Sequence, residues 1–146
     1  MLNGSDYMTY EEYEKLCKIQ QEKNEKYLEI FEDELIEAGL SPKTIKKHLN
    51  NIDFYINEYL LKEKPLDMQE GCGLKIDDFL GYFFIYKCMW STPETIKTTA
   101  ASLKKFYKCM EDNNYVSKDK YKIFKNIIKE NMEIWQQNCD EFNNYY

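Results

Sequence analysis

A short phrase occurs twice in this chain, and it constrains the fold more than any other feature. Ser41-Pro42-Lys43-Thr44-Ile45-Lys46 is matched 51 residues later by Thr92-Pro93-Glu94-Thr95-Ile96-Lys97. In each copy a hydroxyl residue precedes a proline, which is typical of an N-cap followed by Pro at the first helical position. Later apolar positions also correspond, since Ile52 matches Leu103. We therefore expect two related amphipathic helices within a small all-helical domain.

Composition predicts one modest domain without a membrane span. The 146 residues include only 5 glycines and 3 prolines, and helix formers dominate. A chain of this size usually folds around one core. No apolar run is long enough to cross a bilayer, and residues 1–6 contain no hydrophobic signal core. We expect a cytoplasmic protein with no membrane partner.

The five cysteines are widely separated, with no C-x-x-C pair and no histidine close by. This pattern argues against both a zinc site and a disulfide framework. We expect no metal, no cofactor, and reduced thiols that are mostly buried. Cys72 lies between two glycines, which predicts that it is the most accessible of these thiols.

Charge is distributed unevenly, and every basic residue is a lysine. Residues 1–38 carry 4 lysines and 11 acidic residues, a net charge of −7, whereas residues 39–146 carry 16 lysines and 15 acidic residues, a net charge of +1. Without arginine, the chain cannot bind a phosphate through a bidentate guanidinium. The overall charge of −6 disfavours non-specific nucleic-acid binding. A local basic face within residues 39–146, whose charges nearly cancel, is still compatible with the sequence.

Caps and apolar periodicity predict five helical segments. The third, from Ile76 to Trp90, is apolar on nearly all sides. Its part from Tyr82 to Tyr86 fits a strand by periodicity alone, but the length of the segment favours a buried helix. The other four helices are expected to begin near Thr9, Pro42, Thr92 and Ser117. We expect an acidic helical extension at residues 1–25, a helical domain at 26–142 and a flexible tail at 143–146.

Two of the predicted helices carry lysines on the face that the core does not use. On the fourth helix, Lys97, Lys104 and Lys108 recur at i, i+7 and i+11, with Ala101 between them. Small residues among lysines allow a phosphate backbone to come close. The second helix carries Lys43, Lys46 and Lys47 in its first turns, followed by Asn50. The alternative is that both are ordinary solvated helix faces.

The same residues resemble a known family. Residues 39–45 are similar to the opening of the SAM-like core-binding domain of phage integrases and other tyrosine recombinases, and residues 95–107 are similar to its later helix, with lysines where the family has arginines. The resemblance covers roughly Tyr27 to Tyr115. It implies a compact orthogonal bundle of four to five helices that clamps one side of duplex DNA. The DNA-facing positions that it implies are Lys43, Lys46, Lys47, Asn50, Lys97, Thr98, Ala101, Lys104 and Lys105.

The chain departs from that family because the catalytic domain has no counterpart in it. Tyr145 and Tyr146 are not expected to be nucleophiles, since the chain has 13 tyrosines and a terminal position is no distinction. With no arginine and only His48 as an imidazole, phosphotransfer lacks its charge clamp and its acid–base set. We expect no catalytic residues. The chain is then a solitary DNA-binding module, a fragment, or a fold reused for another purpose.

Three functional hypotheses follow. The first is a non-catalytic duplex-DNA-binding accessory or regulator in a phage or mobile-element context. The second is a protein-interaction module, or an acidic inhibitor of a partner, that binds through its acidic amino-terminal helix or through an aromatic surface. The third is an enzyme of unknown type, which the sequence does not favour. A homodimer through the first helix is a further hypothesis, with Gln20 and Asn24 as polar residues in its seam.

Overall fold

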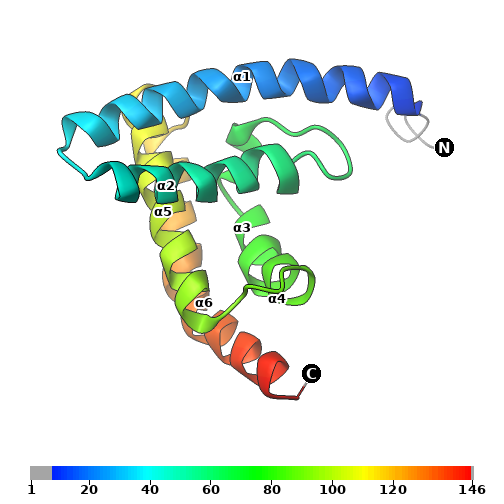
Figure 1. Cartoon of the computed structure of the whole chain (residues 1–146), viewed down its shortest axis with the longest axis vertical. Helices are drawn as coiled ribbons and strands as arrows, with labels where there is room; N and C mark the ends of the chain where they lie inside the picture. The colour runs from blue at the N-terminus through cyan, green and yellow to red at the C-terminus, as the bar shows by residue number, and fades with distance from the viewer. Residues whose placement is uncertain (1–7, 146) are drawn as a thin grey trace. The chain divides into compact units, whose positions relative to one another are not determined.

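The computed structural model describes residues 8–145, and every regular element among them is helical, as predicted (Figure 1). The chain divides into two units, Met1–Met68 and Gln69–Tyr146. The domain limits expected at residues 25 and 142 stay a prediction, and a continuous helix runs through each of these positions. Residues 1–7 and 146, which the expected extension and tail include, lie outside the described residues.

Unit 1 is a helical hairpin. Helix α1 (Tyr10–Glu37) begins at the N-cap Thr9, whose hydroxyl accepts a hydrogen bond from the Glu12 amide at 3.1 Å. It ends at Glu37, and Gly39, two residues further on, adopts a left-handed φ of +81° that favours glycine. Helix α2 (Pro42–Asp53) then runs beside α1 (Figure 1) and continues as the π-helical segment η2 (Phe54–Tyr59).

The interior of unit 1 contains apolar side chains and a cluster of buried polar side chains. Phe31, Ile52 and Tyr55 are fully buried. Asn24 is buried as well and donates hydrogen bonds to the Ile56 carbonyl at 3.1 Å and to Asn57 at 2.7 Å. Among residues 8–145, no buried side-chain nitrogen or oxygen lacks a hydrogen-bond partner, as is usual in native structures.

The residues expected in a dimer seam serve this cluster instead. Gln20 is buried and donates to Asn24 at 3.0 Å and to Asp67 at 2.9 Å. Tyr27 donates to the same Asp67 oxygen at 3.0 Å. This face of α1 is therefore turned inward, so Gln20 and Asn24 are not available to a partner, and the homodimer through the first helix stays a prediction.

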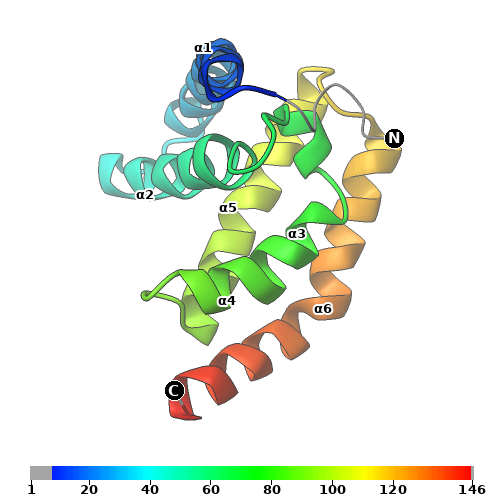
Figure 2. The same ribbon diagram turned by 90° about the vertical axis from the view of Figure 1, so that its right-hand side faces the viewer.

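Unit 2 contains one interrupted helical stretch and two long helices. The elements are η3 (Met68–Gly71), α3 (Lys75–Asp78), η4 (Phe79–Phe83), α4 (Phe84–Lys87), α5 (Pro93–Asp112) and α6 (Lys118–Tyr145). Figure 2 shows α5 and α6 side by side, with the stretch from α3 to α4 packed against α6. The predicted third helix is therefore helical rather than a strand, but it ends at Lys87 because Cys88 is extended.

Local capping accounts for where these helices begin. Thr92 and Thr95 form a reciprocal capping box, with N···O distances of 3.0 and 2.8 Å. At the first copy of the phrase, Ser41 accepts from the Thr44 amide at 3.2 Å. Ser117 accepts from the Lys120 amide at 3.0 Å. Together with Thr9 at the start of α1, all four predicted N-caps are thus confirmed.

Gly81 provides space for the largest buried side chain. A Cβ atom on Gly81 would lie 2.7 Å from two atoms of the Trp135 indole ring, closer than atoms can pack. We therefore expect Gly81→Ala to lower the free energy of unfolding by about 1–3 kcal/mol through overpacking. Thermal and urea unfolding would measure the loss.

Gly73→Ala is the matched control, because a Cβ at Gly73 meets no atom within 4 Å. It should leave stability unchanged or slightly raised, since alanine restricts the unfolded chain. Equal effects of the two alanine substitutions would contradict the assigned contact.

The prediction for Cys72 is wrong. Its side chain is buried, although glycines flank it, and burial raises the pKa of its thiol to about 12. The thiol is therefore protonated at neutral pH and unreactive. All five cysteines are free thiols and four are buried, as expected for structural cysteines; Cys17 is the partly accessible one.

Among the described residues, no helix combines the length and the apolar character that crossing a bilayer requires.

Candidate nucleic-acid interface

The geometry of the candidate site depends on how α5 and α6 pair. The connection between them is short, and Asn114 turns it with a φ of 67°. The rings of Tyr107 and Phe124 pack with centroids 4.8 Å apart. The Tyr121 hydroxyl donates to the Lys104 carbonyl at 3.1 Å. These contacts fix the two helices as an antiparallel pair, so that residues early in α6 lie beside residues late in α5.

A groove of about 600 Å³ runs between these two helices. We call it the lysine groove. Four lysines line it, two from each helix, around apolar and small residues. Its lining residues are Lys97, Ala100, Ala101 and Lys104 from α5, and Lys125, Asn126, Ile128, Lys129 and Met132 from α6.

The lysines of the groove have no carboxylate within salt-bridge distance among the described residues. None of the lining residues is acidic. The Lys125 ammonium lies 4.8 Å from the centre of the Tyr121 ring, a cation–π distance. The hydroxyl of the same Tyr121 donates a hydrogen bond to the Lys104 carbonyl of α5. The Tyr121 ring therefore contacts both Lys125 and α5.

The structure separates the residues predicted on α5 into two groups. Lys97, Ala101 and Lys104 line the groove. Lys105 is exposed but lies outside the lining, and the Thr98 hydroxyl donates to the Thr95 carbonyl within its own helix at 3.2 Å.

Lys108, also predicted to contact DNA, is engaged within the chain. Its ammonium forms salt bridges with Glu111 at 2.7 Å and Asp112 at 3.1 Å. These hydrogen-bonded carboxylates raise the pKa of Lys108. A bound phosphate would have to compete with two carboxylates there, so Lys108 contributes less free charge than the lysines of the groove.

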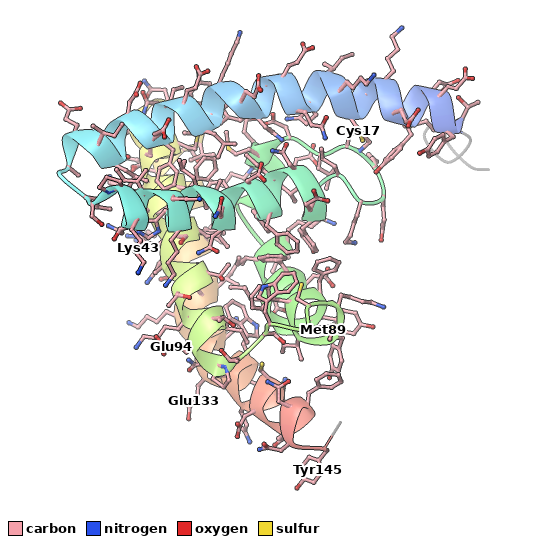
Figure 3. The ribbon with its side chains drawn as sticks, viewed as in Figure 1. Cys17, Lys43, Met89, Glu94, Glu133 and Tyr145 are labelled. Carbon is pink, nitrogen blue, oxygen red and sulfur yellow. The ribbon has the colours of Figure 1, made fainter. Side chains whose placement is uncertain are left out.

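The residues predicted on α2 form a separate surface on unit 1. Lys43, Lys46, Lys47 and Asn50 are all exposed, and Figure 3 shows Lys43 at the start of the helix. Their spacing of three and four residues places them on one face of α2. Their role in binding stays a prediction.

Three polar residues of the groove, Lys125, Asn126 and Lys129, were missed by the sequence reasoning, along with the apolar lining residues Ala100, Ile128 and Met132. A signal for them was present, because Lys118, Lys122, Lys125 and Lys129 recur at i, i+4, i+7 and i+11. The lysine stripe on α5 repeats at i, i+7 and i+11, with Ala101 at i+4, but only the helix pairing brings the two stripes together.

The acidic residues of α1 take part in a groove of their own. A hollow of about 630 Å³ on unit 1 is lined by Glu22, Glu25, Asp53 and Glu58, together with Lys18, Gln21, Leu28 and Asn57. Within residues 8–145, no group of three or more His, Cys, Asp or Glu side chains is arranged to hold a metal ion.

Comparison with known proteins returned no match to any family model, to any curated protein or to any solved structure.

Proposed function

We propose that this chain is a non-catalytic protein that binds the phosphate backbone of duplex DNA through the lysine groove. The observation that carries the proposal is the set of four lysines without carboxylate partners, converging from α5 and α6 on one hollow. Lysines that neutralise phosphates release counterions condensed on the DNA, and a lysine without a carboxylate partner has no ion pair to break first.

The dimensions of the groove suit one backbone strand. Seven residues separate Lys97 from Lys104, which is about 10 Å along a helix at ~1.5 Å per residue. Because a DNA strand winds around the duplex, its successive phosphates lie farther apart than their axial rise of ~3.4 Å, so this length suits contacts with neighbouring phosphates of one strand. Ala100 and Ala101 between the lysines keep the floor of the groove low enough for a close approach.

The proposed binding is to the backbone and not to particular bases. Lysine is a flexible point charge that suits phosphate contacts, and the chain contains no arginine, whose rigid planar fork would fix a bidentate geometry. The function that fits is an accessory or regulatory role, and the resemblance to the integrase core-binding domain supports a phage or mobile-element setting.

The proposal predicts weak, salt-sensitive binding to DNA. Fluorescence anisotropy of a labelled duplex, titrated with the full chain, should give a log–log salt slope of about −3.6, because each of four lysine contacts contributes ~0.9. A slope near −6 would indicate that the lysines of α2 also engage. Absence of binding at about 50 mM salt, where such contacts are strongest, would overturn the proposal.

A second candidate function rests on the acidic hollow of unit 1. Its four carboxylates, on Glu22, Glu25, Asp53 and Glu58, would suit a basic protein segment rather than nucleic acid. This corresponds to the protein-interaction hypothesis. It becomes the leading candidate if the DNA titration fails and a lysine-rich peptide binds with an affinity that Glu22→Lys/Glu25→Lys removes.

A further inference from the structure

A second hollow of unit 2 has a different chemistry from the lysine groove. It has a volume of about 320 Å³ and is lined by one residue of α4 and four residues near the end of α6. We call it the aromatic hollow; its lining residues are Tyr86, Asn138, Glu141, Phe142 and Tyr145. The four residues of α6 are spaced by three, four and seven positions, which places them on one face of that helix. Figure 3 shows Tyr145 at the end of α6.

Three aromatic rings line the aromatic hollow. The rings of Tyr86 and Phe142 have centroids 4.8 Å apart and planes at 78°, so they form two walls nearly at right angles. Tyr82 packs against Tyr86 with ring centroids 5.0 Å apart and supports that wall. Tyr145 supplies the third ring, from a position three residues after Phe142. Three π systems therefore surround one small space.

The charge at the aromatic hollow favours a cation. Among the described residues, Glu141 is the one charged residue in the lining, and it forms no salt bridge. Its carboxylate accepts a long hydrogen bond from the Gln137 amide at 3.4 Å. Lys87, which follows Tyr86, is exposed but lies outside the lining. A cation in the hollow is attracted both by the carboxylate and by the faces of the rings.

The size and the polar groups of the hollow indicate which kind of cation fits. A volume of about 320 Å³ is at the small end for ligand pockets, and suits one head group better than a large cofactor. A primary ammonium carries three N–H donors that each need an acceptor. A quaternary ammonium has no such donors and presents its charge through methyl groups, which pack on aromatic rings. Because the hollow is formed mainly by rings, it suits the methylated cation better.

We infer that the aromatic hollow binds a methylated ammonium group, of the kind present in choline and in trimethylated lysine side chains. Since the centroids of Tyr86 and Phe142 are 4.8 Å apart, a cation beside both rings lies within the ~6 Å at which cation–π attraction acts. Tyr145 adds a third ring, and Glu141 supplies the opposite charge. The hollow shares no lining residue with the lysine groove, so this inference does not depend on DNA binding.

Titration of the isotope-labelled full chain with choline, at constant ionic strength and without DNA, tests this inference. We expect amide shifts at the residues lining the hollow and a dissociation constant of about 0.1–5 mM. The neutral analogue 3,3-dimethylbutan-1-ol has the same shape without the charge, and should bind at least about tenfold more weakly. Equal affinities for the two compounds, or no shift of the lining residues at about 50 mM choline, would overturn the inference.

Two short capped peptides distinguish a free ligand from a modified protein. One carries a single trimethylated lysine between alanines, and the other carries the unmethylated lysine. A trimethylated peptide that binds more tightly than choline would support a modified lysine as the source, whereas tighter binding of choline would support a free small molecule. Equal binding of the methylated and unmethylated peptides would contradict the inferred preference for methyl groups.

Ring substitutions assign the binding to this hollow. Tyr86→Ala should weaken choline binding about three- to tenfold, whereas Tyr86→Phe keeps the ring and should retain the affinity. Tyr145→Ala removes a ring that is 79% exposed, so it tests the site without risk to folding, and it should also weaken binding. Tyr10→Ala is the matched control, because Tyr10 is 73% exposed on α1 and outside the hollow. Affinity that both ring deletions leave unchanged, or that Tyr10→Ala lowers equally, would overturn the assignment.

Discussion

Replacing Lys125 and Lys129 with glutamate should lower the affinity of the chain for duplex DNA by more than about tenfold, because two of four attractive phosphate contacts become repulsive. Both residues line the lysine groove, and neither forms a salt bridge with a residue of the described range. The log–log salt slope should become shallower by about 1.8 as two contacts are lost. Anisotropy titrations at several salt concentrations measure both quantities.

A charge-matched control keeps this prediction specific. Lys15→Glu/Lys26→Glu alters two exposed lysines of α1 and changes the net charge by the same amount. If binding depends on the groove, the control should retain most of the affinity. Equal losses in the two double variants would mean that overall charge, rather than the groove, governs binding.

Trp135→Ala should lower the free energy of unfolding by about 3–5 kcal/mol, the largest stability effect that we expect from one substitution. Trp135 is a buried residue of α6, and its indole N–H donates a hydrogen bond to the Asp77 carboxylate at 2.7 Å. Truncation would leave a large cavity against Gly81 and remove the link between α3 and α6. Urea unfolding followed by circular dichroism would measure the change.

Trp90 offers the comparison, because it is the other tryptophan and is 56% exposed. Trp90→Ala should cost less than half as much, since a partly exposed ring loses less contact and leaves no closed cavity. A loss below about 1 kcal/mol for Trp135→Ala would show that unit 2 does not depend on this packing.

Features encoded over a few neighbouring residues could be predicted from the sequence. The caps at Ser41, Thr92 and Ser117 each depend on a hydroxyl group three residues before an amide, and all three form as expected. The helical class follows from the same signals. Helix ends with weaker local signals were predicted less accurately. The third helix, for example, ends at Lys87 rather than at Trp90.

Features that depend on tertiary pairing could not be predicted in this way. The sequence displays the lysines of α5 and α6 as separate stripes, and only the antiparallel packing makes Lys104 and Lys125 neighbours. Cys72 was misjudged for a similar reason, since flanking glycines describe the backbone but not the side chains that bury the thiol.

Chemical-shift mapping of the isotope-labelled chain, titrated with a short duplex at low salt, tests the central claim most directly. We predict that the largest amide shifts cluster on residues lining the lysine groove, among them Ala101, Lys104, Asn126 and Lys129. Shifts confined to the exposed face of α2, or no shifts on α5 and α6 at saturating DNA, would contradict the assignment of the groove as the DNA-binding site.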